Sequence, residues 1–267
     1  MSRDLNIALE AAKAGLEVIR SFEKKDLNIQ MKGRHDLVTD ADVATEKAIL
    51  KVIRTHCYED IVVAEESASE WERSEGRVWF VDPIDGTTNF AYGFPVYCIS
   101  IALWVDGEPT AAVVLEVNRE ELFTAERGKG AFLNGEKITV SSEGDPDRAF
   151  LATGFPYTDH SILDEYIVLF RRIIGEVQGI RRPGAATWDL CCVACGRFQG
   201  FWEYGLSAWD VAAASLIVRE AGGVVTDWKG GSNWLWGRRI IAANPAIHQY
   251  LKRAIVGTLP ESSLEIK

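Results

Sequence analysis

The fold and the chemistry of this 267-residue chain are organised around one stretch, Val78-Trp79-Phe80-Val81-Asp82-Pro83-Ile84-Asp85-Gly86-Thr87-Thr88-Asn89-Phe90. Its first four residues are apolar, which predicts a short buried strand that ends at Asp82. Pro83 has no N–H to donate to a sheet, so we expect the chain to turn at once. The turn then brings the carboxylates of Asp82 and Asp85 to the same side.

Groups that suit an anion follow these carboxylates directly. Gly86 allows a backbone conformation, or a close approach, that a side chain would obstruct. Thr87 and Thr88 offer hydroxyls and backbone N–H groups at an expected helix start, which attracts phosphate above all. Hard oxygen ligands beside anion donors indicate metal-assisted phosphate chemistry. Asp-Pro and Asp-Gly are also ordinary turn dipeptides, so this stretch alone leaves a plain strand-to-turn junction open.

The composition is that of a soluble globular protein, with 47% hydrophobic and 25% charged residues. The formal net charge of −10 argues against general binding to nucleic acid or to anionic membranes. An enzyme this acidic needs bound cations to attract an anionic substrate. Five cysteines, three of them within residues 191–195, predict reduced thiols and a cytoplasmic protein. No signal peptide and no membrane-spanning run is expected.

The periodicity of apolar residues changes along the chain. It predicts a helix–loop–helix beginning, with helices over 4–24 and 40–56 and a loop over 25–38. Alternating strands and turn signals over 96–140 predict an antiparallel meander. Strands and helices then alternate to residue 256, which predicts a partly parallel sheet with covering helices. A boundary near 141–147 would leave a crevice between two halves, where a site is expected.

Carboxylates follow apolar strands at further points. Glu65 ends a short strand over 61–64, and Asp210 lies in the first turn of an expected helix. Each has a structural alternative, because Glu65 could be a solvated strand end and Ser207 to Asp210 matches a capping box. The segment from Thr39 to Asp42 matches the same capping pattern.

Three segments, in this order and spacing, resemble the motifs of the inositol monophosphatase family of magnesium-dependent, lithium-sensitive phosphatases. They are Glu65-Glu66-Ser67, Asp82 to Phe90, and Trp209-Asp210-Val211-Ala212-Ala213 through Glu220-Ala221-Gly222-Gly223. The resemblance covers roughly residues 5–255. It implies an α/β (α+β) fold of the sugar phosphatase type, a layered α-β-α-β-α sandwich with an antiparallel N-terminal sheet and a mixed C-terminal sheet. It also implies an active site between an N-terminal half, 1–143, and a C-terminal half, 144–267.

The family pattern implies roles for the matching positions. Glu65, Asp82 and the backbone carbonyl of Ile84 would hold a first Mg²⁺, and Asp82, Asp85 and Asp210 a second. Glu65 would help to place a third ion, and Mn²⁺ is an alternative metal. The catalytic group would be Glu65 with Asp42 and Thr87, the last two orienting the attacking water. Substrate would be bound by Asp85, Gly86, Thr87, Gly184, Ala185, Ala186, Glu203 and Asp210.

General chemistry supports the metal assignment independently. Carboxylate and carbonyl oxygens suit a hard cation such as Mg²⁺. Paired ions about 3.5–4 Å apart stabilise both the entering and the leaving oxygen of an in-line displacement. Two or three such ions would neutralise or reverse the charge of four carboxylates, so a phosphate dianion could enter an acidic protein.

Several positions bear on the choice of substrate. Glu203 matches the family position that contacts substrate hydroxyls. An acidic residue at the end of a strand, without a role in binding, is an equally good interpretation. Ala185 stands where many members have Thr or Ser, and Ser207 replaces a His of the animal enzymes, which weakens strict inositol specificity. Arg181 and Arg182 suit a second phosphate, which leaves fructose 1,6-bisphosphate open beside a plain surface ion pair.

The sequence therefore predicts a phosphoric monoester hydrolase that acts on myo-inositol 1-phosphate or a similar polyol or sugar phosphate. The expected mechanism is direct attack of a metal-activated water, without a covalent phosphoenzyme. Alternatives within this class are a fructose-1,6-bisphosphatase, an enzyme with both activities, a histidinol-phosphatase and a bisphosphate nucleotidase. Outside it, some family members bind transcription machinery, and arginine pairs at 171–172, 181–182 and 238–239 could form a local basic surface. The family also implies a homodimer.

Overall fold

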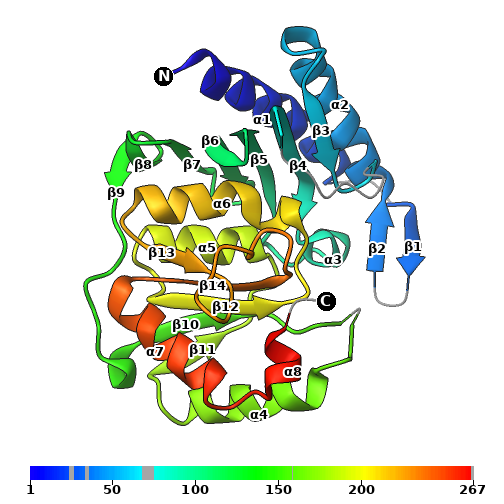
Figure 1. Cartoon of the computed structure of the whole chain (residues 1–267). Coiled ribbons are helices and arrows are strands. Elements are labelled where there is room, and N and C mark those ends of the chain that lie inside the picture. The colour runs from blue at the N-terminus through cyan, green and yellow to red at the C-terminus, as the bar shows by residue number, and fades with distance from the viewer. Residues whose placement is uncertain (24–26, 34–35, 68–74, 158, 266–267) are drawn as a thin grey trace.

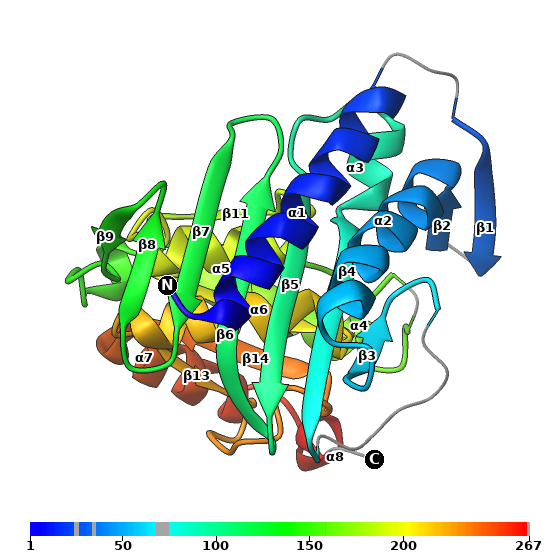
Figure 2. The ribbon, with the colours of Figure 1, turned by 90° about the horizontal axis from the view of Figure 1, so that it is seen from above.

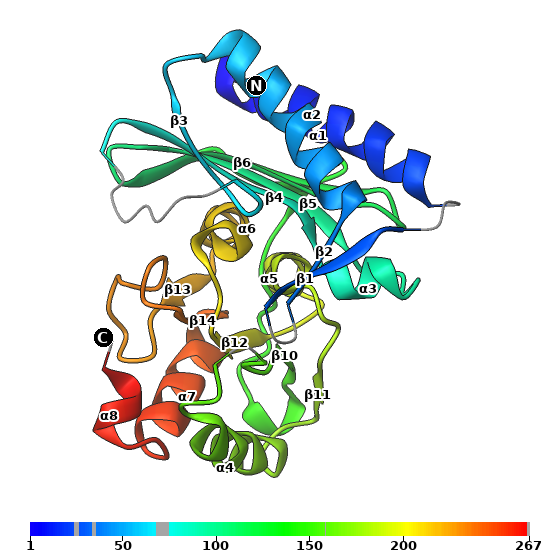
Figure 3. The same cartoon turned by 90° about the vertical axis from the view of Figure 1, so that its right-hand side faces the viewer.

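Helices and sheets alternate in the order helix, sheet, helix, sheet, helix (Figure 3). The computed structural model describes residues 1–23, 27–33, 36–67, 75–157 and 159–265. This arrangement confirms the layered α/β sandwich that the sequence predicts. Within the described residues, no helix combines the length and apolar character needed to cross a bilayer.

The first layer is a pair of helices that lie across one face of the larger sheet (Figure 2). Helix α1 (Arg3–Phe22) has Ser2 as its N-cap, and α2 (Asp40–His56) begins with a capping box. In that box the side chains of Thr39 and Asp42 each accept from the backbone N–H of the other. Apolar side chains of both helices pack against the sheet in one continuous core. The sequence pattern therefore located both helices correctly.

Two short strands lie in the segment predicted as a loop, so that prediction is wrong. Strands β1 (Ile29–Gly33) and β2 (Asp36–Thr39) form an antiparallel ribbon with an irregularity between Met31 and Gly33. Ile29 and Met31 are exposed. Leu37 and Val38 are half-buried, so the side chains that the structure describes in the ribbon do not alternate between buried and exposed, the pattern by which a half-buried strand is recognised.

The larger sheet has seven strands in sequence order, from β3 to β9. Only the pair β3–β4 is parallel, and every other neighbouring pair is antiparallel, which confirms the meander. Strand β9 was not predicted, since it has only three residues. The strands are β3 (Ile61–Ala64), β4 (Arg77–Asp85), β5 (Cys98–Val105), β6 (Glu108–Glu116), β7 (Glu121–Glu126), β8 (Gly130–Leu133) and β9 (Glu136–Ile138).

Strand β4 continues past Pro83 to Asp85, so the expected immediate turn does not occur there. Its register with β5 shifts between Asp82 and Asp85. Pairing with β3 stops at Val81, so one side of Pro83 needs no hydrogen-bonding partner. The turn comes at Gly86, where φ is +96° and a Cβ would lie 3.0 Å from the carbonyl oxygen of Val96. Gly86 is the N-cap of α3 (Thr87–Ala91).

The second sheet has five strands in the order β11-β10-β12-β14-β13. Strand β10 runs parallel to β11 and β12, while β14 runs antiparallel to β12 and β13, so the sheet is mixed, as expected. The strands are β10 (Phe150–Thr153), β11 (Gly179–Arg181), β12 (Gly200–Tyr204), β13 (Val224–Thr226) and β14 (Arg239–Ala243). Short 3₁₀ and α turns lie at η1 (Pro146–Arg148) and α8 (Glu261–Leu264).

Two helices fill the space between the sheets, and two more cover the outer face of the smaller sheet (Figure 1). The inner helices are α5 (Ala186–Ala194) and α6 (Ala208–Glu220), and the outer ones are α4 (Leu163–Ile174) and α7 (Pro245–Val256). The inner pair belongs to one core with residues of both sheets. The division at residue 143 stays a prediction.

Candidate active site

Four acidic side chains from separate parts of the chain approach one another between the two sheets. Glu65 follows β3, Asp82 and Asp85 lie at the end of β4, and Asp210 lies in the first turn of α6. Burial raises the pKa of Asp82 well above its usual range, and the charges of Glu65, Asp85 and Asp210 raise it further. The structure therefore brings together the acidic residues that the sequence singled out.

The same cause acts on two other members of the group. The pKa of Asp85 rises to about 7, chiefly through burial, against the opposing effect of hydrogen bonds from Thr187. Burial and then the charge of Asp85 raise the pKa of Asp210 to about 7. Like charges so placed repel one another, and a divalent cation between them would remove that repulsion.

Backbone N–H groups hold three of these carboxylates in place. The N–H of Ile84 donates to Oδ1 of Asp82 at 3.0 Å. The N–H of Thr187, at the start of α5, donates to Oδ2 of Asp85 at 2.7 Å. The N–H of Ser207 donates to Oδ2 of Asp210 at 2.7 Å. Helix capping thus accounts for the local position of Asp210, but not for its approach to the other acids.

Asp42 and Thr87 form a second feature next to the acidic group. Thr87 Oγ1 lies 3.0 Å from Oδ1 of Asp42 and 3.1 Å from the carbonyl oxygen of Ile84. The other oxygen of Asp42 accepts from the N–H and the hydroxyl of Thr39, at 2.8 and 2.6 Å. Asp42 is fully buried. The capping box of α2 therefore also fixes the carboxylate to which Thr87 can donate.

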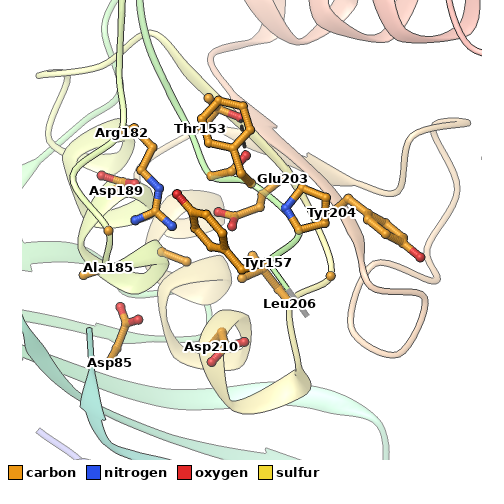
Figure 4. Close-up of a pocket in the computed structure, with 16 residues that line it drawn as sticks. Asp85, Thr153, Tyr157, Arg182, Ala185, Asp189, Glu203, Tyr204, Leu206 and Asp210 are labelled. Carbon is orange, nitrogen blue, oxygen red and sulfur yellow. Dashed lines mark hydrogen bonds between the residues drawn. The ribbon is translucent and has the colours of Figure 1, made fainter. Parts of the chain in front are cut away.

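A cavity of about 210 Å³ opens beside Asp85 and Asp210 (Figure 4). It is lined by four of the other predicted substrate residues, which are Gly184, Ala185, Ala186 and Glu203. A neighbouring hollow of about 570 Å³ shares Tyr157, Arg182 and Gly184 with it. That hollow is lined by three further predicted residues, Glu65, Gly86 and Thr87. Asp82 and Ile84 lie beneath the surface, 1% and 0% exposed.

The two arginines of the predicted pair occupy different surroundings. The guanidinium of Arg182 lines the cavity and stacks on Tyr157, 5.0 Å from the ring centroid. Arg181 packs on Phe150, 4.5 Å from its ring centroid, and lines neither hollow. Arg182 alone therefore faces a ligand that enters the cavity.

Glu203 extends from β12 into the cavity and is 7% exposed. Burial raises its pKa to about 8, and the charge of Arg182 opposes the rise. Asp189 of α5 also lines the cavity, and sequence reasoning missed it. The only available signal was a lone carboxyl within an otherwise apolar helix.

The acidic group offers oxygen donors of the kind that a divalent ion needs. In the described ranges, no three His, Cys, Asp or Glu side chains already stand as a ready-made metal centre. The donors nevertheless consist of carboxylate oxygens with the nearby carbonyl of Ile84, and oxygen donors are what Mg²⁺ prefers. The chemistry of this set fits Mg²⁺, and binding would draw the side chains together.

The fold and the acidic cavity define a layered α/β protein with a hydrophilic site between its two sheets. The chain belongs to the inositol monophosphatase family, which it matches over residues 1–263. It is 43% identical over 264 residues to Nus factor SuhB of Pseudomonas aeruginosa, covering 97% of each chain. It is 43% identical over 255 residues to inositol-1-monophosphatase of a Synechocystis strain, covering 95% of this chain and 89% of that relative. The crystal structure of extragenic suppressor protein suhB from Bartonella henselae superposes with a TM-score of 0.91 at 39% identity, covering 97% of this chain and all of that one.

Proposed function

We propose that this protein is a Mg²⁺-dependent phosphomonoesterase acting on myo-inositol 1-phosphate or a similar polyol or sugar monophosphate. The observation that carries the proposal is the approach of Glu65, Asp82, Asp85 and Asp210 to one another beside a cavity that contains Glu203. Members of this family use divalent metal ions. A relative that is named an inositol-1-monophosphatase supports the substrate class.

Two groups of oxygen atoms would hold the ions. Glu65, Asp82 and the carbonyl of Ile84 would hold one Mg²⁺, and Asp82, Asp85 and Asp210 a second. A third ion near Glu65, and Mn²⁺ in place of Mg²⁺, belong to the same proposal. When bound, the ions supply the positive charge that attracts the phosphate group and stabilises its developing negative charge.

The protein's own contribution to hydrolysis is the positioning of water and of the leaving group. When the Thr87 hydroxyl donates to Asp42, its oxygen keeps free lone pairs that accept a hydrogen from water. That contact orients the lone pairs of the water toward phosphorus. The N–H groups of Gly86 and Thr87 would hold the phosphate, while Gly184, Ala185, Ala186 and Glu203 line the space for the leaving group. No side chain is required as a nucleophile.

The test uses purified protein freed of metal with a chelator. We expect release of phosphate from inositol 1-phosphate to return on addition of Mg²⁺ and to be abolished in Asp82→Asn. Hydrolysis in ¹⁸O-water should place one label in the phosphate within a single turnover. An active metal-free enzyme, or a phosphorylated side chain, would contradict the proposal.

A second candidate function is binding to transcription machinery, because relatives at 41–43% identity are named Nus factor SuhB. The arginine pairs give it limited support. Arg172 donates to the hydroxyl of Thr258 at 2.9 Å, and the buried Arg239 donates to the carbonyl of Ser263 at 3.0 Å. Association with a transcription complex that persists in Asp82→Asn would support this role. Association that is absent in both the unmodified protein and this variant would exclude it.

A further inference from the structure

Asp189 is a buried carboxyl group for which neither the metal proposal nor the packing of α5 gives a reason. Its residue is 2% exposed, and its Oδ1 has no hydrogen-bonding partner within the described part of the chain. A buried polar atom without a partner costs stability, and an ionised carboxylate costs more. Such a group at the edge of a cavity is satisfied when a ligand with hydrogen-bond donors enters.

Asp189 shares its surroundings with two polar groups from other elements. Its pKa is raised well above the usual range, first by burial and then by the charges of Glu203 and Asp85, while Arg182 opposes the rise. All of these residues line the same cavity. Figure 4 shows Asp189, Arg182 and Glu203 around one part of it, with Asp85 and Asp210 in another part. The acids of the proposed metal site therefore lie in one part of the cavity, and the polar group of Asp189, Arg182 and Glu203 lies in another.

Two glycines leave the space that this polar group occupies. A Cβ on Gly154 would lie 1.8 Å from Oε1 of Glu203, so any other residue there would displace that carboxyl group. A Cβ on Gly184, where φ is +94°, would lie 2.6 Å from Nη1 of Arg182. The backbone thus accommodates both side chains within the cavity wall.

The three groups have complementary hydrogen-bonding roles. Ionised carboxyl groups only accept, a protonated one also donates, and the guanidinium of Arg182 only donates. A hydroxyl group both donates and accepts, so adjacent hydroxyls can satisfy acids and guanidinium together. An apolar leaving group would leave Asp189 and Glu203 without partners.

We propose that Asp189 is a specificity-determining residue that, with Glu203 and Arg182, binds a second hydroxyl group of the leaving group and so selects polyol monophosphates. This inference rests on the proposed phosphatase function. It adds a named residue and a requirement for at least two free hydroxyls.

The experiment compares two substrates in the Mg²⁺-loaded enzyme. Inositol 1-phosphate has a polyol leaving group, whereas p-nitrophenyl phosphate has a leaving group without hydroxyls. In Asp189→Leu, which removes the acceptor oxygens but keeps the branched shape of the side chain, we expect kcat/KM for inositol 1-phosphate to fall on the order of 10- to 100-fold. We expect kcat/KM for p-nitrophenyl phosphate to change less than about threefold. Asp189→Asn keeps one acceptor oxygen and should lose less.

Controls separate this role from a purely structural one. Asp164→Asn, on the exposed side of α4, should change neither rate. Equal losses on both substrates in Asp189→Asn would show that Asp189 only supports α5, and no loss on either substrate in Asp189→Leu would show that it binds no hydroxyl. Either result overturns the inference while the proposed function stands. Failure of the unmodified enzyme to hydrolyse both substrates would overturn the proposed function, and the inference with it.

Discussion

The backbone N–H of Thr187 donates a hydrogen bond to Oδ2 of Asp85 at 2.7 Å, across 102 residues of sequence. The hydroxyl of Thr187 also donates to the backbone carbonyl of Asp210 at 2.9 Å. One residue at the start of α5 therefore connects β4 with α6, and with them two of the four acids of the proposed metal site.

Thr187→Val removes the contacts of the hydroxyl with the carbonyl of Asp210 and with Asp85, while the N–H of residue 187 still donates to Asp85. We expect the free energy of unfolding to fall by about 1–2 kcal/mol. The Mg²⁺ concentration for half-maximal activity should rise several-fold, since α6 and Asp210 are held less firmly. Urea unfolding and a Mg²⁺ titration measure the two effects. Thr110→Val is the matched control, because that hydroxyl donates to the carbonyl of Glu108 in its own hairpin, away from the acidic residues of the proposed metal site. An unchanged Mg²⁺ requirement would contradict the expected connection.

Asp210→Asn separates stability from activity. Asn can still accept from the N–H of Ser207, so the helix start is kept, while one of the mutually repelling charges is lost. We expect the metal-free protein to gain about 1–2 kcal/mol of stability. Phosphatase activity should fall on the order of 100-fold or more. Thermal unfolding with chelator, compared with Mg²⁺, tests this. A metal-free variant less stable than the unmodified protein would show that repulsion does not dominate there.

Glu203 should make stability depend on pH in a defined direction. Its pKa rises from an ordinary 4.5 to about 8 in the folded protein, so the folded state binds more protons between these values. The contribution of Glu203 to the free energy of unfolding is fully present below about pH 4.5 and is lost as the pH rises through about 8. Glu203→Gln should flatten this slope and raise stability at pH 8 by on the order of 2 kcal/mol. Urea unfolding at a series of pH values measures it, and an unchanged slope would show that Glu203 titrates normally.

Gly154→Ala should displace Glu203, because the added methyl would overlap its carboxyl group. We expect a loss of about 1–3 kcal/mol in stability. Hydrolysis of inositol 1-phosphate should fall more than that of p-nitrophenyl phosphate. Gly175→Ala is a matched control, because its Cβ would meet nothing closer than 3.5 Å. Equal kinetics for both substrates in Gly154→Ala would argue against a contact between Glu203 and the leaving group.

Much of the fold could be predicted because its elements carry strong local patterns. The second helix matched residues 40–56, and strand β8 matched 130–133. The ribbon of β1 and β2 could not be found, since its described side chains do not alternate between buried and exposed. The continuation of β4 through Pro83 was not predicted. The strand tolerates a proline there because its pairing with β3 stops at Val81, and the local sequence does not encode where that pairing stops.

The site was predictable where a motif marks it. Asp82 and Asp85 lie in one short stretch, and Asp210 lies in a second motif. Asp189 was missed because its neighbours in sequence are apolar helix residues, and only the packing of α5 against β12 shows that it faces a cavity. Arg181 and Arg182 were indistinguishable in sequence, and their surroundings differ because Arg181 is the last residue of β11, whereas Arg182 follows the strand and stacks on Tyr157.

The position of α5 and α6 between the two sheets has a consequence for synthesis on the ribosome. The seven-stranded sheet is complete by residue 138, but one of its faces is covered by helices that begin only at residues 186 and 208. A nascent chain of intermediate length therefore presents an uncovered apolar face, which makes it a substrate for chaperones until its last third has emerged.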